Sequence, residues 1–207
     1  RPPRSTLFPY TTLFRSSGLE CDYVILGEPT DNQLVRHQKG ALVFQAAATG
    51  TAGHSGYPES GSSAIHTLLA ILHQWLQTDW GHDPILGATT LNIGRIQGGR
   101  AVNVIADAAE AEGIFRLTVD PHTILARLQS VVDPSLTIRV LSASPPQHLF
   151  TPPDRAGIVV SFGSDAAYLQ PIGKVLMVGP GSIHQAHRET EHINTADILA
   201  AIELYAE

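Results

Sequence analysis

The residues best suited to chemistry lie in the segment GPGSIHQAHRETEH, which runs from Gly179 to His192. It follows an apolar run, Val175 to Val178, that is typical of a buried strand. Imidazole nitrogens and carboxylate oxygens are the ligands that zinc takes in proteins. A strand leading into a Gly-rich loop is a common way to present ligands at the edge of an α/β sheet. The segment contains His184, His187, His192, Glu189 and Glu191, and it predicts a metal site.

A second carboxylate stands at the end of another predicted strand. The run CDYVILG, Cys21 to Gly27, leads into Glu28-Pro29-Thr30. A carboxylate after a strand can also be an ordinary surface residue. Because His187 and Glu191 stand four residues apart and Glu28 also follows a strand, a shared metal site is favoured over that reading.

The elements that must position these residues fall into two sets. Apolar spacing predicts two strands joined at Lys39-Gly40 within residues 34–49, and an amphipathic helix from Ser63 to Trp80. Alternation predicts strands at 89–96, 108–119 and 136–141, with Ile114, Leu117 and Val119 as packing residues and a helix from Pro121 to Val132. The order strand, helix, strand, strand, helix, strand is the split βαβ, or ferredoxin-like, pattern. We therefore expect an inserted domain at 39–145, between pieces of a larger α/β domain at 17–38 and 146–207.

Composition narrows the class of protein. The net charge of −6 argues against a nucleic-acid partner, and no apolar run is long enough to predict a membrane span. Cys21 is the only cysteine, so no intramolecular disulfide can form. This favours a reducing, cytoplasmic location. We expect Cys21 to be a buried strand residue rather than a nucleophile, since nothing near it in sequence would lower its pKa.

The first sixteen residues differ in composition from the rest of the chain. The segment RPPRSTLFPYTTLFRS, residues 1–16, holds three arginines and no acidic residue. It closely resembles the translation of a sequencing adapter, so we expect it to be non-native. Native sequence that preceded Ser17 is then expected to be missing.

The motifs, taken together and in order, resemble the two-metal aminohydrolases that include acetylornithine deacetylase, succinyl-diaminopimelate desuccinylase, aminoacylase and carboxypeptidase G. The resemblance covers Cys21 to Glu207. It rests on GEPT (27–30), GHSGYP (53–58), NVI (103–105), FR (115–116), GSD (163–165) and GPGSIHQAH (179–187). It implies an α/β fold: part of a zinc-aminopeptidase-like catalytic domain with an inserted ferredoxin-like, two-layer α+β dimerisation domain.

The resemblance also implies roles for single residues. Glu28 would bind one zinc or cobalt ion and His187 the other, with Glu191 orienting the His187 ring. His54 would reach across a homodimer, formed through the inserted domain, to stabilise the partner's oxyanion. The substrate would contact Asn103, Arg116, Gly163 and Ser164. From position alone, Arg116 could instead be a solvated strand residue, and Asn103 could close the turn after Gly98-Gly99. The remaining histidines are expected at the solvated surface: His37, His66, His73, His82, His122, His148, His184 and His192.

Three further parts of the family pattern have no counterpart in the sequence: a His-x-Asp motif, a bridging Asp and a Glu-Glu pair that includes the general base. We therefore expect an inactive fragment. Its full-length parent would hold two metal ions and deacylate a small N-acyl amino acid, N-acetylornithine by the wording of GEPT and GPGSIHQAH. Succinyl-diaminopimelate, a dipeptide or an N-acyl lysine are alternative substrates. A non-catalytic dimerisation or binding module is the alternative from another class.

Overall fold

The computed structural model describes residues 18–130 and 134–206, and its chain forms two units. Unit 2 is the continuous stretch Lys39–Pro146, and unit 1 combines the residues before it with those from Gln147 onward. The segment predicted to be adapter-derived, residues 1–16, lies outside the described residues. The described helices include none that is both long and apolar enough to cross a lipid bilayer.

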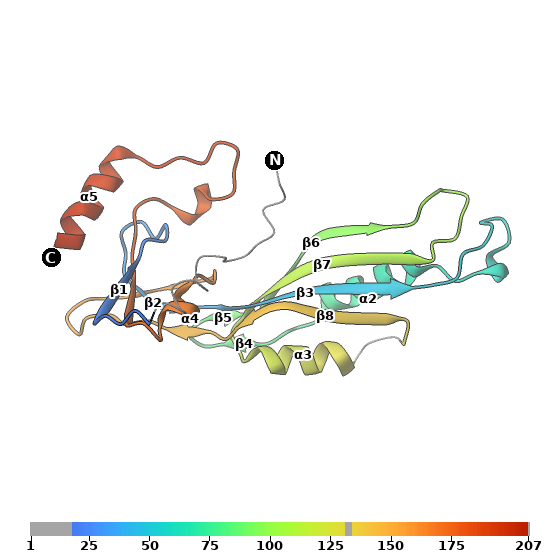
Figure 1. Ribbon diagram of the computed structural model, residues 1–207, viewed down its shortest axis with the longest axis horizontal. Coiled ribbons are helices and arrows are strands. Elements are labelled where there is room, and N and C mark those ends of the chain that lie inside the picture. The colour runs from blue at the N-terminus through green and yellow to red at the C-terminus, as the bar shows by residue number, and fades with distance from the viewer. Residues whose placement is uncertain (1–17, 131–133, 207) are drawn as a thin grey trace. The chain divides into compact units, whose positions relative to one another are not determined.

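Unit 2 is a four-stranded antiparallel sheet with two helices. In chain order its elements are β3 (Gly40–Thr49), η1 (Pro58–Ser60), α2 (Ala64–Gln77), β4 (His82–Asp83), β5 (Gly87–Ala88), β6 (Thr90–Gly98), β7 (Ala108–Leu117), α3 (Pro121–Ser130) and β8 (Leu136–Ser144). The strands lie side by side in the order β6-β7-β3-β8 (Figure 1). This is the ferredoxin-like arrangement that the order of elements predicts.

One face of this sheet carries the core of unit 2. Burial alternates along β3 and β7, because successive side chains of a strand point to opposite faces. Phe44 of β3 and Phe115 of β7 are fully buried, and Trp75 of α2 packs edge-on against Phe44. The predicted packing residue Ile114 lies on the other face and is only half-buried, so Phe115 takes the core position that we had assigned to it.

Helix α2 begins at the predicted start but ends earlier than predicted. Ser63 is the N-cap, and its hydroxyl accepts a hydrogen bond from the His66 N–H at 3.3 Å. The helix ends at Gln77, three residues before the predicted end at Trp80. Trp80 nevertheless remains in the core, because its indole N–H donates to the Trp75 carbonyl at 2.9 Å.

Unit 1 is built around a small mixed sheet. Its elements are β1 (Tyr23–Leu26), β2 (Val35–Gln38), β9 (Gln147–His148), β10 (Ile158–Val160), α4 (Ala166–Leu169), β11 (Lys174–Met177), η2 (Ile183–Gln185) and α5 (Thr195–Ala206). The strand order is β1-β11-β2-β10, and β9 pairs with β2. Val35 and Met177 are fully buried at its centre. Cys21, predicted to be buried, is an exposed free thiol because β1 begins only at Tyr23.

Candidate functional site

The two predicted metal-ligand loops of unit 1 are joined by main-chain hydrogen bonds. The Thr30 N–H donates to the Gly179 carbonyl at 3.1 Å, and the Asp31 N–H donates to the Gly181 carbonyl at 2.8 Å. The Thr30 hydroxyl accepts from the Gly179 N–H at 3.1 Å and donates to the Gln33 carbonyl at 2.7 Å. The ends of β1 and β11, which are parallel neighbours, therefore carry the two loops to one edge of the sheet.

A tight turn directly after Glu28 fixes this arrangement. Asp31 and Asn32 both have positive φ angles, of 52° and 57°, and the Gln33 N–H donates to the Thr30 carbonyl at 3.0 Å. Two successive left-handed residues closed by this bond form a type I′ turn, for which Asp and Asn are among the best-suited residues. The turn reverses the chain from β1 toward β2 and leaves Glu28 at the sheet edge.

Glu28 lies close enough to Asp165 and His187 for both to change its pKa. Burial raises the pKa of the Glu28 carboxyl, the Asp165 carboxylate raises it further, and His187 lowers it. A desolvated carboxylate beside a second carboxylate and an imidazole is an environment that favours a bound cation. The structure thus brings Glu28 and His187, which are far apart in sequence, to one place.

Asp165 is a site residue that the sequence analysis did not single out. Burial raises the pKa of its carboxyl. Its Oδ1 atom is buried and has no hydrogen-bond partner among the described residues. The only sequence signal for it is its place in the Gly163-Ser164-Asp165 segment, and its nearness to Glu28 depends on the long-range packing of the sheet.

His187 has the left-handed backbone that is uncommon outside glycine, with φ 64°. Its side chain is exposed. The Glu191 carboxylate accepts a hydrogen bond from the main-chain N–H of His187 at 3.0 Å. This corrects the predicted role of Glu191, since the contact holds the backbone of His187 in place rather than its imidazole ring.

Ser164 has an interior role in this structure. Its hydroxyl donates to the Gln38 Oε1 atom at 2.6 Å and accepts from the Ala166 N–H at 3.2 Å, and both bonds are buried. In this structure the Ser164 hydroxyl is occupied by these two bonds, and the predicted role of Ser164 in substrate binding stays a prediction. Gly163 is half-buried beside it.

The donor types at this edge suit zinc, but their number does not complete a site. Carboxylate oxygen and imidazole nitrogen are both zinc ligands, and a catalytic zinc usually has three protein ligands. Across residues 18–130 and 134–206 no three histidine, cysteine or acidic side chains come close enough to hold a metal ion. The described residues at this edge thus offer donor types that zinc takes, without forming a complete metal site.

In unit 2, His54 and Asn103 lie together at one end of the sheet. His54 forms a bridge with Val104, and the Ser55 N–H donates to the Asn103 carbonyl at 3.1 Å. The His54 ring is exposed, and its Nδ1 atom accepts a hydrogen bond from the Gly56 N–H at 3.1 Å. Because Nδ1 is an acceptor, a neutral ring carries its proton on Nε2 and presents an N–H donor there.

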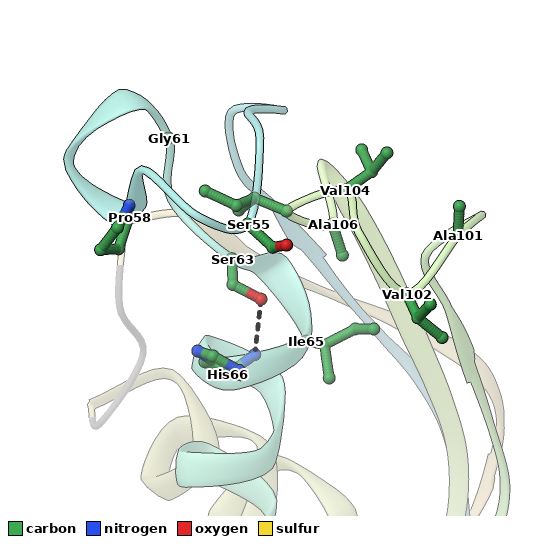
Figure 2. Close-up of a pocket in the computed structure, with 11 residues that line it drawn as sticks. Ser55, Pro58, Gly61, Ser63, Ile65, His66, Ala101, Val102, Val104 and Ala106 are labelled. Carbon is green, nitrogen blue, oxygen red and sulfur yellow. Dashed lines mark hydrogen bonds between the residues drawn. The ribbon is translucent and has the colours of Figure 1, made fainter.

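A pocket of about 440 Å³ opens beside this end of unit 2 (Figure 2). Ile65 and His66 of α2 line one side, and Val102 and Val104 line the other. Val102 is fully exposed. An exposed apolar side chain at the rim of an apolar pocket is typical of a surface that contacts another molecule.

Arg116 lies on β7, on the sheet face opposite Phe115. Its guanidinium is half-buried, burial lowers its pKa, and it takes part in none of the ion pairs among the described residues. Its cross-strand neighbours are Ala41 and Thr90, which are small. Arg116 is therefore a half-buried cation whose two cross-strand neighbours carry no charge.

Comparisons with known proteins agree with this fold. Residues 36–136 match the M20_dimer family model, the peptidase dimerisation domain. A peptidase M20 domain-containing protein of Schizosaccharomyces pombe is 35% identical over 197 residues, covering 94% of this chain and 49% of that protein. A "probable carboxypeptidase" of Aspergillus fumigatus is 35% identical over 223 residues, covering 96% of this chain and 50% of that protein. The chain thus spans about half the length of these relatives.

Solved structures show the same fold. A tripeptidase of Staphylococcus aureus has a TM-score of 0.64 and 19% identity, over 91% of this chain and 55% of its own. The aminopeptidase PepT of Bacillus cereus has a TM-score of 0.63 and 18% identity, over 88% of this chain and 54% of its own. The fold is mixed α/β, with the ferredoxin-like unit 2 inserted between the two parts of unit 1.

Proposed function

We infer that this chain is part of a metal-dependent M20-type hydrolase that cleaves an amide bond next to a free carboxylate. The observation that carries this proposal is the set of hydrogen bonds between Thr30 and Gly179, which holds the loops of Glu28 and His187 at one sheet edge. The coarse chemistry is also supported by the relatives, which are named as peptidases and carboxypeptidases.

In the proposed site, Glu28 and His187 are ligands of two different zinc or cobalt ions, and Asp165 lies near enough to Glu28 to raise its pKa. A bound metal ion would polarise the amide carbonyl and acidify a water molecule. The chain's own contribution is to hold the ligands in place. The Thr30 bonds fix the loop of Glu28, and Glu191 fixes the backbone of His187.

Arg116 is proposed to bind the substrate carboxylate. A guanidinium offers paired N–H donors that match both oxygens of a carboxylate. The half-buried position strengthens such a pair, because fewer water molecules compete for it. Asn103 is proposed to add an amide contact to the same class of substrate.

His54 and Arg116 cannot serve one site within a single copy of unit 2. Arg116 pairs with Ala41 near the start of β3, whereas the strand pair Thr49–Ala108 marks the other end, where the His54 loop begins. The eight residue-to-residue steps along β7 from Ala108 to Arg116 span about 27 Å. We therefore propose that His54 donates its Nε2–H to the oxyanion in a partner subunit.

The homodimer is proposed to form through α2 and the neighbouring edge strand β6. Leu69 and Leu76 of α2 are 50% and 54% exposed, and Ile96 of β6 is 53% exposed. The two leucines are seven residues apart, so they lie on one face of the helix. Exposed apolar residues beside an unpaired strand edge favour pairing with a second copy.

The substrate proposed first is N-acetylornithine, because the residues of the GEPT and GPGSIHQAH motifs resemble those of acetylornithine deacetylase. The carboxypeptidase names of the relatives favour a second candidate, the C-terminal bond of a peptide. Both substrates place a carboxylate beside the scissile amide, which is the feature that Arg116 would recognise. Activity of a full-length parent against N-acetylornithine, N-succinyl-diaminopimelate and dipeptides would separate them, and a preference for dipeptides would overturn the first choice.

Calorimetric zinc titration of the 207-residue chain tests the incomplete site directly. We expect weak binding that weakens further in Glu28→Gln and in His187→Gln. Two tight stoichiometric sites would overturn the proposal that this chain holds only part of the ligand set. Hydrolysis by the full-length parent, lost in Glu28→Gln, would separate the enzyme from a non-catalytic dimerisation module.

A cytoplasmic location is also proposed. Cys21, the only cysteine of the sequence, is an exposed free thiol, and such thiols persist in reducing compartments. Fractionation of cells that express the full-length protein would test this location.

A further inference from the structure

Two histidines that were expected from the sequence to be solvated face each other in unit 1. His37 lies on β2 and His148 on β9, and they are directly opposite in the antiparallel register. Their Nδ1 atoms are 3.3 Å apart, although 111 residues separate them in sequence. The ring centroids are 4.7 Å apart, with an angle of 61° between the ring planes.

This nitrogen–nitrogen distance matches two ligands of one tetrahedral metal ion. Zinc–nitrogen bonds of about 2.0–2.1 Å at the tetrahedral angle place two ligand nitrogens roughly 3.3–3.4 Å apart. Neutral imidazole binds metals through Nδ1 as well as Nε2. Without a metal ion, the same geometry lets one ring donate a single N–H to the other. A metal ion would replace that shared proton once each ring turns to point its Nδ1 lone pair at the ion.

The pair can be reached from solvent. His148 is exposed, and His37 is half-buried. His148 also lines a pocket of about 450 Å³ with Gln170 and Lys174, which leaves room for water ligands. The Lys174 ammonium lies 5.5 Å and 5.3 Å from the ring centroids of Tyr23 and Phe150, so the cation in this pocket is held over aromatic faces.

We propose that His37 and His148 bind one divalent transition-metal ion, of the Zn²⁺, Ni²⁺ or Cu²⁺ class, with water as the remaining ligands. The site is independent of the proposed hydrolytic function, because it uses neither Glu28 nor His187. The bound ion joins β2 to β9, the strands through which the chain leaves and re-enters unit 1. Metal binding therefore stabilises this strand pair in the folded state.

The test uses the 207-residue chain in a His187→Gln background, which removes the imidazole of the proposed hydrolytic edge. Co²⁺ titration, followed by the visible absorption of tetrahedral cobalt, should show one site. His148→Gln should lower its affinity at least tenfold, whereas the control His184→Gln should leave it unchanged. Because His148 is exposed, its replacement is not expected to unfold the chain, and circular dichroism checks this point.

A second measurement identifies the ligands themselves. Pulsed electron paramagnetic resonance of bound Cu²⁺ should show two imidazole nitrogens in the His187→Gln chain and one after His37→Gln. Zn²⁺ should raise the midpoint of thermal unfolding in the His187→Gln chain and not in His37→Gln/His148→Gln/His187→Gln. Unchanged Co²⁺ affinity in His148→Gln, or an equal zinc shift in that triple variant, would overturn the proposal.

Discussion

Thr30 and Gly179 exchange two hydrogen bonds across 149 residues of sequence, and this pair holds the two ligand loops of unit 1 together. The Thr30 N–H donates to the Gly179 carbonyl, and the Gly179 N–H donates to the Thr30 hydroxyl, each at 3.1 Å. Both residues are buried, so water cannot readily replace either hydrogen bond. Breaking one would leave a buried polar group unpaired, which costs free energy. The positions of Glu28 and His187 therefore depend on this contact.

Replacing Thr30 with Val should separate the loops. The change keeps the shape of the side chain but leaves the buried Gly179 N–H and Gln33 carbonyl without the hydroxyl, which should lower the free energy of unfolding by about 1–3 kcal/mol. Urea unfolding checks the stability, and calorimetry should show weaker zinc binding. Thr30→Ser retains the hydroxyl and should keep most of both properties. Equal loss in the Ser and Val variants would show that the methyl group matters instead.

Gly179 should tolerate no side chain. A Cβ atom there would lie 2.5 Å from the Glu28 carbonyl oxygen and 2.7 Å from the Gly27 carbonyl carbon. Both contacts are with backbone, so Gly179→Ala should destabilise unit 1 by about 1–3 kcal/mol or more. At Gly27 the nearest atom to an added Cβ is the Tyr205 hydroxyl, at 3.7 Å. Gly27→Ala is therefore the matched control, and equal unfolding midpoints for the two variants would contradict this account.

Local periodicity was enough to predict the main elements of unit 2. The apolar spacing of residues 63–80 predicts α2, which the structure places at Ala64–Gln77 with Ser63 as its N-cap. The prediction that Ile114 packs in the core was wrong, because the apolar alternation along β7 does not by itself say which alternate residues face the core. Leu117 fixes the parity of β7, and alternation then places Phe115 in the core and Ile114 outside. The strands β4 and β5 are only two residues long, so they have no period to detect.

The site could be predicted only in part, because its neighbours come from distant segments. Glu28 and His187 are visible in sequence through the strands and glycines beside them. The effect of Asp165 on Glu28 requires the packed sheet. The facing of His37 and His148 depends on the pairing of β9 with β2. A two-residue strand that begins next to Pro145-Pro146 has no sequence signal for its partner.

The proposed dimer predicts that a charge on the outer face of α2 will disrupt association. Leu76→Glu should shift the 207-residue chain toward monomer, because a buried leucine contributes about 1.5–3 kcal/mol at an interface. That loss corresponds to at least about a tenfold rise in the dimer dissociation constant. Sedimentation equilibrium measures it directly. Leu141→Glu places the same charge on β8, the other sheet edge, where Leu141 is 40% exposed, and should leave association unchanged.

The opposite outcome for the two variants would place the dimer interface on a different edge of the sheet. If Leu141→Glu dissociated the dimer and Leu76→Glu did not, the β8 edge would be the contact. If neither variant changed the mass, association through unit 2 would lose its support.

We expect unit 1 to become less stable at alkaline pH because of Tyr205. The Tyr205 hydroxyl of α5 donates to the Val178 carbonyl at 2.8 Å, and burial raises the pKa of the phenol above its usual value of 10.0. Above pH 10 the unfolded chain loses this proton before the folded chain does, so the folded state binds more protons. Stability from this group is therefore complete below pH 10 and declines as pH rises through the folded pKa.

Tyr205→Phe should remove both the bond and this decline. At pH 7 the variant should be less stable by about 0.5–1.5 kcal/mol, the usual contribution of one hydrogen bond. Between pH 10 and higher values the difference from the parent chain should shrink, because only the parent loses the contribution. Urea unfolding across this range measures the difference, with Tyr57→Phe, at a 63% exposed tyrosine, as the control. A difference that stays constant with pH would mean that Tyr205 anchors α5 through its ring and not through its hydroxyl.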